Sequence, residues 1–166
     1  MAKSKSGFSG LTPWLLLAAV VAISDQLTKL LVLRSFKFQE RLTVIQDFFD
    51  LTLVFNKGAA FSFLAGAGGW QRWFFIGIGL LAVCFLLYLL AKHGGQKLFA
   101  FGVAMILGGA IGNIIDRIHA GQVTDFLLFY WRSYYFPAFN LADSAITLGA
   151  ACLILDELRR VMASRR

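Results

Sequence analysis

The chain has 166 residues, of which 58% are hydrophobic and 15% are charged, and its formal net charge is +7. A soluble domain carries about 25% charged residues, and one of this length could not bury so many apolar side chains in a single core. The composition therefore excludes an ordinary soluble domain and predicts a membrane protein. Two cysteines, Cys84 and Cys152, form no CxxC pair, which argues against a disulfide scaffold or a dithiol site.

Four apolar stretches are long enough to predict membrane spans: residues 14–33, 73–91, 98–115 and 139–155. A spanning helix needs about 20 mostly apolar residues. We therefore expect an integral membrane protein, mainly α-helical, with four transmembrane helices in a single membrane domain over residues 1–166. A cleavable signal peptide is the alternative for the first stretch, but the apolar run continues to Leu33 and is long enough to remain as a span.

Lysine and arginine are unevenly distributed among the connecting segments. Segments 1–12, 92–97 and 156–166 contain eight of them, whereas the longer segments 34–72 and 116–138 contain seven. Because positively charged loops face the cytoplasm, we expect both termini inside and the two longer loops outside. The net charge also fits attraction to anionic lipid, and no motif suggests nucleic acid as a partner.

The first outer loop, about residues 36–70, predicts β-structure. Residues 42–63 are rich in β-branched and aromatic side chains, and residues 65–69 (AGAGG) are too rich in glycine for regular structure. We expect a small extracytoplasmic β-rich cradle that lies on the membrane. We also expect residues 56–62 to cover the site proposed below as a lid that opens and closes.

Four of the seven aspartates lie in or beside the predicted spans, and the predicted orientation places all four near the outer face. Ionisable groups inside a membrane are costly and are functional candidates by default. Asp25 and Lys29 are four residues apart, so they share a helix face and are expected to form a structural ion pair. Asn113, Asp116 and Arg117 are expected to form a structural polar cluster at the end of the third span.

The other two aspartates, Asp125 and Asp143, stand in apolar surroundings at the outer ends of the third and fourth spans. The spacing of Asn140 and Asp143 is that of a helix capping box, so capping and catalysis remain alternatives for Asp143. Two carboxylates that meet at a desolvated site tend to share a proton. One can then activate water while the other protonates a carbonyl oxygen, which is peptide hydrolysis.

Three functions remain open from the residues alone. A small ion-coupled transporter could use the same aspartates as a proton relay, although such sites usually lie near the membrane midplane, often within repeats. A non-catalytic scaffold would leave two aspartate motifs unexplained. A serine peptidase is disfavoured, because no G-x-S-x-G motif is present and His93 and His119 fall at opposite faces. The outer face has no cluster of His and Cys, so we expect no metal.

Five ordered motifs resemble those of bacterial lipoprotein signal peptidase, also called signal peptidase II. They are Asp25 with Lys29, residues 56–62 (NKGAAFS), 108–117 (GGAIGNIIDR), 123–126 (VTDF) and 139–143 (FNLAD). The resemblance covers nearly the whole chain and shows no departure at the positions that the family uses.

The resemblance implies an aspartic endopeptidase of the bacterial inner membrane. Such an enzyme removes signal peptides from diacylglyceryl-modified prolipoproteins by cleaving just before the lipidated lipobox cysteine. It implies that Asp125 and Asp143 are the catalytic dyad, and that further residues line or support the site: Asn56, Gly58, Asn113, Arg117 and Asn140. It also implies no metal or organic cofactor, a prolipoprotein substrate and membrane lipid as partners. We expect a monomer.

Overall fold

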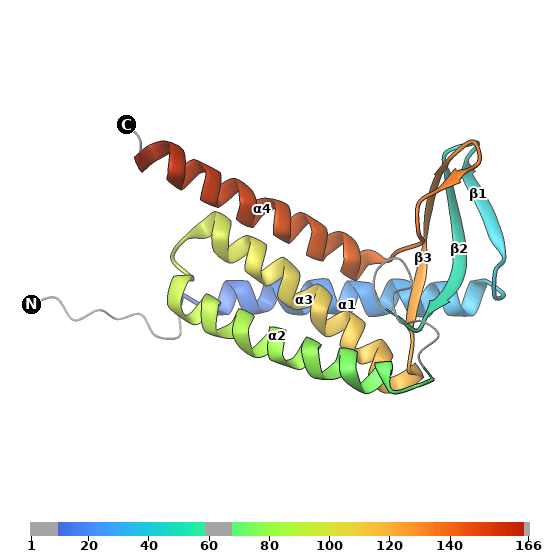
Figure 1. Cartoon of the computed structure of the whole chain (residues 1–166), viewed down its shortest axis with the longest axis horizontal. Helices are drawn as coiled ribbons and strands as arrows, with labels where there is room; N and C mark the ends of the chain where they lie inside the picture. The colour runs from blue at the N-terminus through green and yellow to red at the C-terminus, as the bar shows by residue number, and fades with distance from the viewer. Residues whose placement is uncertain (1–9, 59–67, 165–166) are drawn as a thin grey trace, which may run out of the picture.

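The structure is a computed structural model that describes residues 10–58 and 68–164. Four long helices form a bundle, and a small sheet lies across one end of it (Figure 1). The helices are α1 (Thr12–Ser35), α2 (Gln71–His93), α3 (Lys97–Ala120) and α4 (Leu141–Ser164). The strands are β1 (Arg41–Ile45), β2 (Phe49–Asn56), β3 (Val123–Trp131) and β4 (Tyr134–Tyr135). The mainly helical fold expected from the sequence is confirmed.

The helix bounds follow the predicted apolar stretches, except at the end of α3, which reaches Ala120 instead of residue 115, and at the end of α4. This helix continues to Ser164, well beyond the predicted end at residue 155, because a helix can extend past its apolar part. There the i,i+4 pair of Asp156 and Arg160, 2.7 Å apart, stabilises the charged turns. Within the described ranges, α1, α2 and α3 are long and apolar enough to cross a membrane, whereas α4 is not among the helices that meet this criterion.

The helix α3 packs against the other three helices and forms the centre of the bundle. Its Val103 and Leu107 are fully buried against Leu90 of α2 and Ala18 of α1. Gly112 permits the close approach of α1, since a Cβ atom there would lie 2.5 Å from Oδ2 of Asp25. The outer faces of α1 and α2 leave many large apolar side chains exposed, as expected for helices in contact with lipid.

The sheet is antiparallel with the strand order β1-β2-β3-β4. Strands β1 and β2 confirm the β-structure expected in the first outer loop, whereas β3 and β4 were not expected. The residues of β3 (VTDFLLFYW) are mostly β-branched or aromatic, which is the signal that would have predicted this strand. Arg132, at the turn between β3 and β4, has a positive φ of 56°.

An isolated β-bridge joins the middle of β3 to the segment just before α4. The backbone N–H of Leu127 donates to the carbonyl of Phe139 at 2.8 Å, and the N–H of Phe139 donates to the carbonyl of Leu127 at 3.0 Å. The bridge lies two residues after Asp125 and one residue before Asn140. It therefore holds the aspartate of β3 near the first turn of α4.

Most of the predicted lid, residues 56–62, and part of the predicted glycine-rich connector, residues 65–69, lie outside the described residues. The opening and closing of this segment stays a prediction.

Candidate active site

A cleft of about 870 Å³ lies between the sheet and the sheet-proximal parts of α3 and α4. Asp125 of β3 and Asp143 of α4 both line it, together with Asn56, Asn113 and Arg117. Most of its other lining residues are apolar. On α4, lining residues recur every three or four positions: Ser144, Thr147, Leu148 and Ala151. One face of α4 therefore forms a wall that extends from the aspartates along the helix bundle.

Asn140 connects the two cleft carboxylates. Its side-chain Nδ2 donates to Oδ1 of Asp125 at 2.7 Å, and its Oδ1 accepts a hydrogen bond from the backbone N–H of Asp143 at 2.9 Å. The backbone N–H of Asn140 donates in return to Oδ2 of Asp143 at 3.3 Å. This is the reciprocal pattern of a capping box. Asp143 thus takes part in the cap of α4 and lines the cleft at the same time. The capping expected from the spacing is therefore present, and it leaves the carboxylate facing the cleft.

Asn113 holds the other oxygen of Asp143. Its Nδ2 donates to Oδ1 of Asp143 at 2.8 Å, while its own Oδ1 accepts hydrogen bonds from Lys29 at 3.1 Å and Asn140 at 3.3 Å. These two donors fix which way the amide faces, because its oxygen must point to them and its NH₂ group to Asp143. The side chain of Asn56 hydrogen-bonds Asp125. Neutral amides therefore position both carboxylates.

The surroundings of Asp125 change its acidity. The pKa of Asp125 is raised from an ordinary 3.8 to about 7, chiefly by burial and then by the nearby Asp143 carboxylate. The hydrogen bonds from Asn140 and Asn56 act in the opposite direction, because they stabilise the charged form. A carboxyl group with a pKa in this range can take up and release its proton near neutral pH.

The other two aspartates meet at a buried lysine. Nζ of Lys29 lies 2.8 Å from Oδ2 of Asp25 and 2.9 Å from Oδ2 of Asp116. The second oxygen of Asp25 accepts the backbone N–H of Ala142 at 2.9 Å, and Oδ2 of Asp116 accepts the backbone N–H of Thr124 at 3.0 Å. We call Lys29, Asp25 and Asp116 the Lys29 cluster. It joins α1, α3, β3 and α4, and none of its members lines the cleft.

Arg117 lies beside the cleft with its guanidinium bound to backbone. It donates to the carbonyl of Gly58 at 2.8 Å and to that of Asn113 at 3.2 Å, and it lies 5.2 Å from the ring centre of Phe75. Gly58 in turn donates its N–H to Oδ1 of Asn56 at 2.9 Å. Arg117 therefore anchors the end of β2, and Gly58 supports the cleft without lining it.

The sequence singled out the polar residues of this site but missed the elements that assemble it. From the residues alone, Asn113, Asp116 and Arg117 were expected in one structural cluster, whereas the family resemblance placed Asn113 and Arg117 at the site. Both of these residues line the cleft, and Asp116 does not. Thr124 and Ala142 lie within two of the motifs, but their backbone N–H contacts to the Lys29 cluster were not predicted from the sequence. Among the described residues, no group of three or more His, Cys, Asp or Glu side chains could hold a metal ion.

The chain is similar to proteins of one family. The family described as Signal peptidase (SPase) II matches residues 17–159. A lipoprotein signal peptidase of Ralstonia nicotianae is 56% identical over 161 residues, covering 96% of this chain and 92% of that protein. One of Paraburkholderia phytofirmans is 55% identical over 163 residues, covering 98% and 94%.

Solved structures agree with the fold. A bacterial membrane enzyme determined by the in meso method at 2.3 Å resolution superposes with a TM-score of 0.83 and 32% identity, over 93% of this chain and 91% of that one. A second, at 1.9 Å resolution, has a TM-score of 0.78 and 31% identity, over 95% and 98%. Fold and relatives together define a bacterial membrane peptidase. The chain belongs to the signal peptidase II family.

Proposed function

We propose that this protein is an aspartic endopeptidase of the bacterial inner membrane, with Asp125 and Asp143 as its catalytic dyad. Its family membership supports the removal of signal peptides from prolipoproteins and gives no support to the transporter alternative. The observation that carries the aspartic mechanism is the sharing of one cleft by two carboxylates joined through Asn140. The cut falls just before the lipidated cysteine of the substrate.

In the proposed reaction, a water molecule lies between the two carboxylates. Asp143 removes a proton from this water as it attacks the scissile carbonyl, while Asp125 donates its proton to the carbonyl oxygen. The tetrahedral intermediate then collapses as the oxygen returns its proton to Asp125 and Asp143 protonates the leaving amine. Both carboxyl groups end in their starting states. A pKa of about 7 for Asp125 supports its role as the acid.

The supporting residues act on this pair without exchanging protons. Asn113 and Asn140 hold Asp143 and Asp125, and Asn56 provides a further hydrogen bond to Asp125. Arg117 fixes the end of β2 at the cleft through Gly58. The Lys29 cluster is structural, because both of its carboxylates contact the ammonium group of Lys29 and the cluster lies outside the cleft.

We further propose that α4 is the fourth span of a monomeric, single-domain protein, with both termini in the cytoplasm and the dyad at the outer face. Its 24 residues extend about 36 Å, which is enough to cross the hydrocarbon core. The start of α1 and the end of α4 both lie at the end of the bundle away from the sheet (Figure 1). This arrangement supports placing both termini on one side of the membrane. Lipid and the lipidated prolipoprotein are the partners.

The test is cleavage by the purified protein of a diacylglyceryl-modified prolipoprotein, with the unmodified precursor as control. We expect a mature product that begins at the lipidated cysteine, identified by mass spectrometry of its N-terminus. Cleavage at another bond, or no cleavage by a folded preparation, would overturn the proposal.

A further inference from the structure

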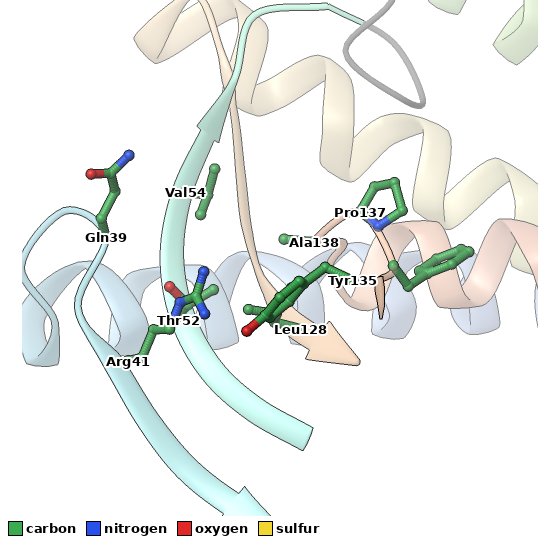
Figure 2. Close-up of a pocket in the computed structure, with 9 residues that line it drawn as sticks. Gln39, Arg41, Thr52, Val54, Leu128, Tyr135, Pro137 and Ala138 are labelled. Atoms are coloured by element: carbon green, nitrogen blue, oxygen red, sulfur yellow. The ribbon is translucent and has the colours of Figure 1, made fainter. Parts of the chain in front are cut away.

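A second cavity of about 540 Å³ lies on the sheet next to the cleft, and we call it the side cavity (Figure 2). It is bounded by Gln39, Arg41, Thr52, Leu128 and Tyr135 and by four residues that also line the cleft: Val54, Phe136, Pro137 and Ala138. Because these four residues border both spaces, the side cavity continues the cleft across the sheet.

The strand register gives the position of the side cavity relative to the dyad. Val54, which borders both spaces, is the cross-strand partner of Asp125. Leu128 borders the side cavity and lies three positions after Asp125 on β3. Since a strand advances by about 3.3 Å per residue, Leu128 is about 10 Å from Asp125. An extended peptide cleaved at the dyad would reach this level with about its third residue beyond the cut.

The shape of the cleft assigns the direction of this peptide, if the proposed function holds. The wall formed by α4 follows the helix bundle, and it is the part of the cleft that suits an apolar signal helix. The residues that follow the scissile bond must then leave on the opposite side, where the side cavity lies over the sheet. The side cavity thus faces the product side of the bond.

The chemistry of the side cavity is set by Arg41. Its guanidinium lies 5.1 Å from the ring centre of Tyr135, which stacks on Tyr130 at 5.2 Å. These rings orient the cation but do not neutralise it. Among the residues that the structure describes, no carboxylate lies within ion-pair distance of Arg41. The hydroxyl of Thr52 already donates to the carbonyl of Glu40 at 2.8 Å. The other polar side chains of the side cavity, Gln39 and Tyr135, are neutral, so its charged group is the guanidinium, which favours carboxylates.

We infer that the side cavity is a subsite for the first residues of the mature lipoprotein. Arg41 favours an acidic side chain at about the third position after the scissile bond. This inference rests on the proposed function and adds a preference on the product side of the cut.

The experiment compares diacylglyceryl-modified prolipoproteins that differ only at the second to fourth positions after the cut, carrying Glu, Gln or Lys in turn. The value of kcat/KM is measured for the wild type, Arg41→Gln and Arg41→Glu. Arg132→Gln is the matched control, because Arg132 lies in the turn that joins β3 and β4 and borders neither space. We expect the wild type and the control to prefer Glu over Lys by about 2- to 5-fold, the range for an exposed ion pair. Arg41→Gln should lose the preference and Arg41→Glu should reverse it.

Equal rates on all three substrates in the wild type, or an unchanged preference in both Arg41 variants, would overturn the subsite while leaving the peptidase intact. No cleavage of any substrate by the wild type would instead contradict the proposed function. A last comparison uses nanodiscs with and without anionic lipid. If Arg41→Gln removes only a dependence on anionic lipid and keeps the Glu preference, Arg41 binds headgroups and the subsite is wrong.

Discussion

Four aspartates gather at the sheet end of the bundle, and they fall into two pairs with different partners. Asp25 and Asp116 share the ammonium group of Lys29, which is 2% exposed, at 2.8 and 2.9 Å. Asp125 and Asp143 have no ion pair within 4.0 Å in the described part of the chain, and side-chain amides hold them. The same type of side chain thus occurs once in direct contact with a shared ammonium group and once held by neutral amides, with Arg117 lining the same cleft.

We expect the pair at Lys29 to have a structural role and the pair in the cleft to have a catalytic one. A carboxylate in contact with a buried cation is fixed by that contact, and removal of its partner is costly. A buried carboxylate beside a second carboxylate and neutral amides has a raised pKa and can exchange a proton. Only the second pair lines the cleft. If the partners determine the roles, substitutions in the two pairs should have different effects on activity and stability.

The largest expected effect is on catalysis. Asp125→Asn and Asp143→Asn should each lower kcat by at least about 100- to 10,000-fold, the contribution of a positioned acid or base. An amide has nearly the shape of the acid, so both variants should remain folded and inserted in the membrane. The assay is cleavage of a lipidated prolipoprotein, with Asp47→Asn at an exposed turn as the control. Near wild-type turnover by either variant would remove that residue from the mechanism.

The second prediction tests Asn140, which connects the two cleft carboxylates. Asn140→Ser retains an oxygen that can cap α4 but lacks the NH₂ group that binds Asp125, whereas Asn140→Ala loses both. Both variants should lower kcat, by about 100-fold for a misplaced catalytic group. Only Asn140→Ala should also lose about 1 kcal/mol of stability. If the two variants lose the same stability in thermal unfolding and the same rate in cleavage assays, Asn140 acts only as a helix cap.

The pH profile should report the raised pKa of Asp125. Because the reaction needs its proton, kcat/KM should fall about tenfold per pH unit above a pH of about 7. Loss of the Asn56 hydrogen bond in Asn56→Ala should raise this pKa and move the alkaline limb to higher pH. A wild-type rate that stays level well above pH 7 would contradict the assignment of the acid.

The same group should affect stability. Its folded-state pKa is raised, so the folded protein binds the proton more tightly than the unfolded chain. The stabilisation is complete below the unfolded pKa of about 4 and is lost as the pH rises through about 7. Asp125→Asn should remove this decline, as measured by thermal unfolding over that pH range. Its persistence in the variant would assign the decline to another group.

A smaller effect on the rate of cleavage is expected from substitutions in the Lys29 cluster. Asp25→Asn should reduce the free energy of unfolding by about 1.5 to 3 kcal/mol, the contribution of hydrogen bonds to a charged group. The folded fraction should cleave at close to the wild-type rate, because Asp25 does not line the cleft. Active-site titration with a tight inhibitor would correct for lower yield. A stable but inactive Asp25→Asn protein would show that Asp25 takes part in catalysis.

No effect is expected from chelation. Hydrolysis by a carboxylate pair needs no divalent ion, and the donors around the cleft are carboxylates and amides without histidine or cysteine. Cleavage should therefore continue unchanged in EDTA. Loss of activity that zinc restores would replace the proton-sharing pair with a metal site.

The sequence predicted the helices well because long apolar runs leave few other structures possible in a membrane. It did not predict β3, because residues 116–138 were interpreted as a loop despite the β-branched and aromatic residues within them. The end of α4 was also missed, because the apolar pattern stops before the helix does.

The sequence predicted that four aspartates lie near one end of the bundle but not how they are held. The i,i+4 spacing of Asp25 and Lys29 and the capping spacing of Asn140 and Asp143 are local, and both contacts are present. The Leu127–Phe139 bridge depends on backbone groups far apart in the chain. No residue pattern specifies that contact, so the arrangement of the cleft required the folded structure.

The most direct test of the account is the protonation of the two pairs of aspartates, measured by infrared difference spectroscopy across pH 7. The carbonyl stretch of a protonated carboxyl group should appear in the wild type and titrate with a pKa of about 7. It should be absent from Asp125→Asn and unchanged in Asp25→Asn. A band that survives in Asp125→Asn and disappears in Asp25→Asn would place the exchangeable proton in the Lys29 cluster and contradict the account.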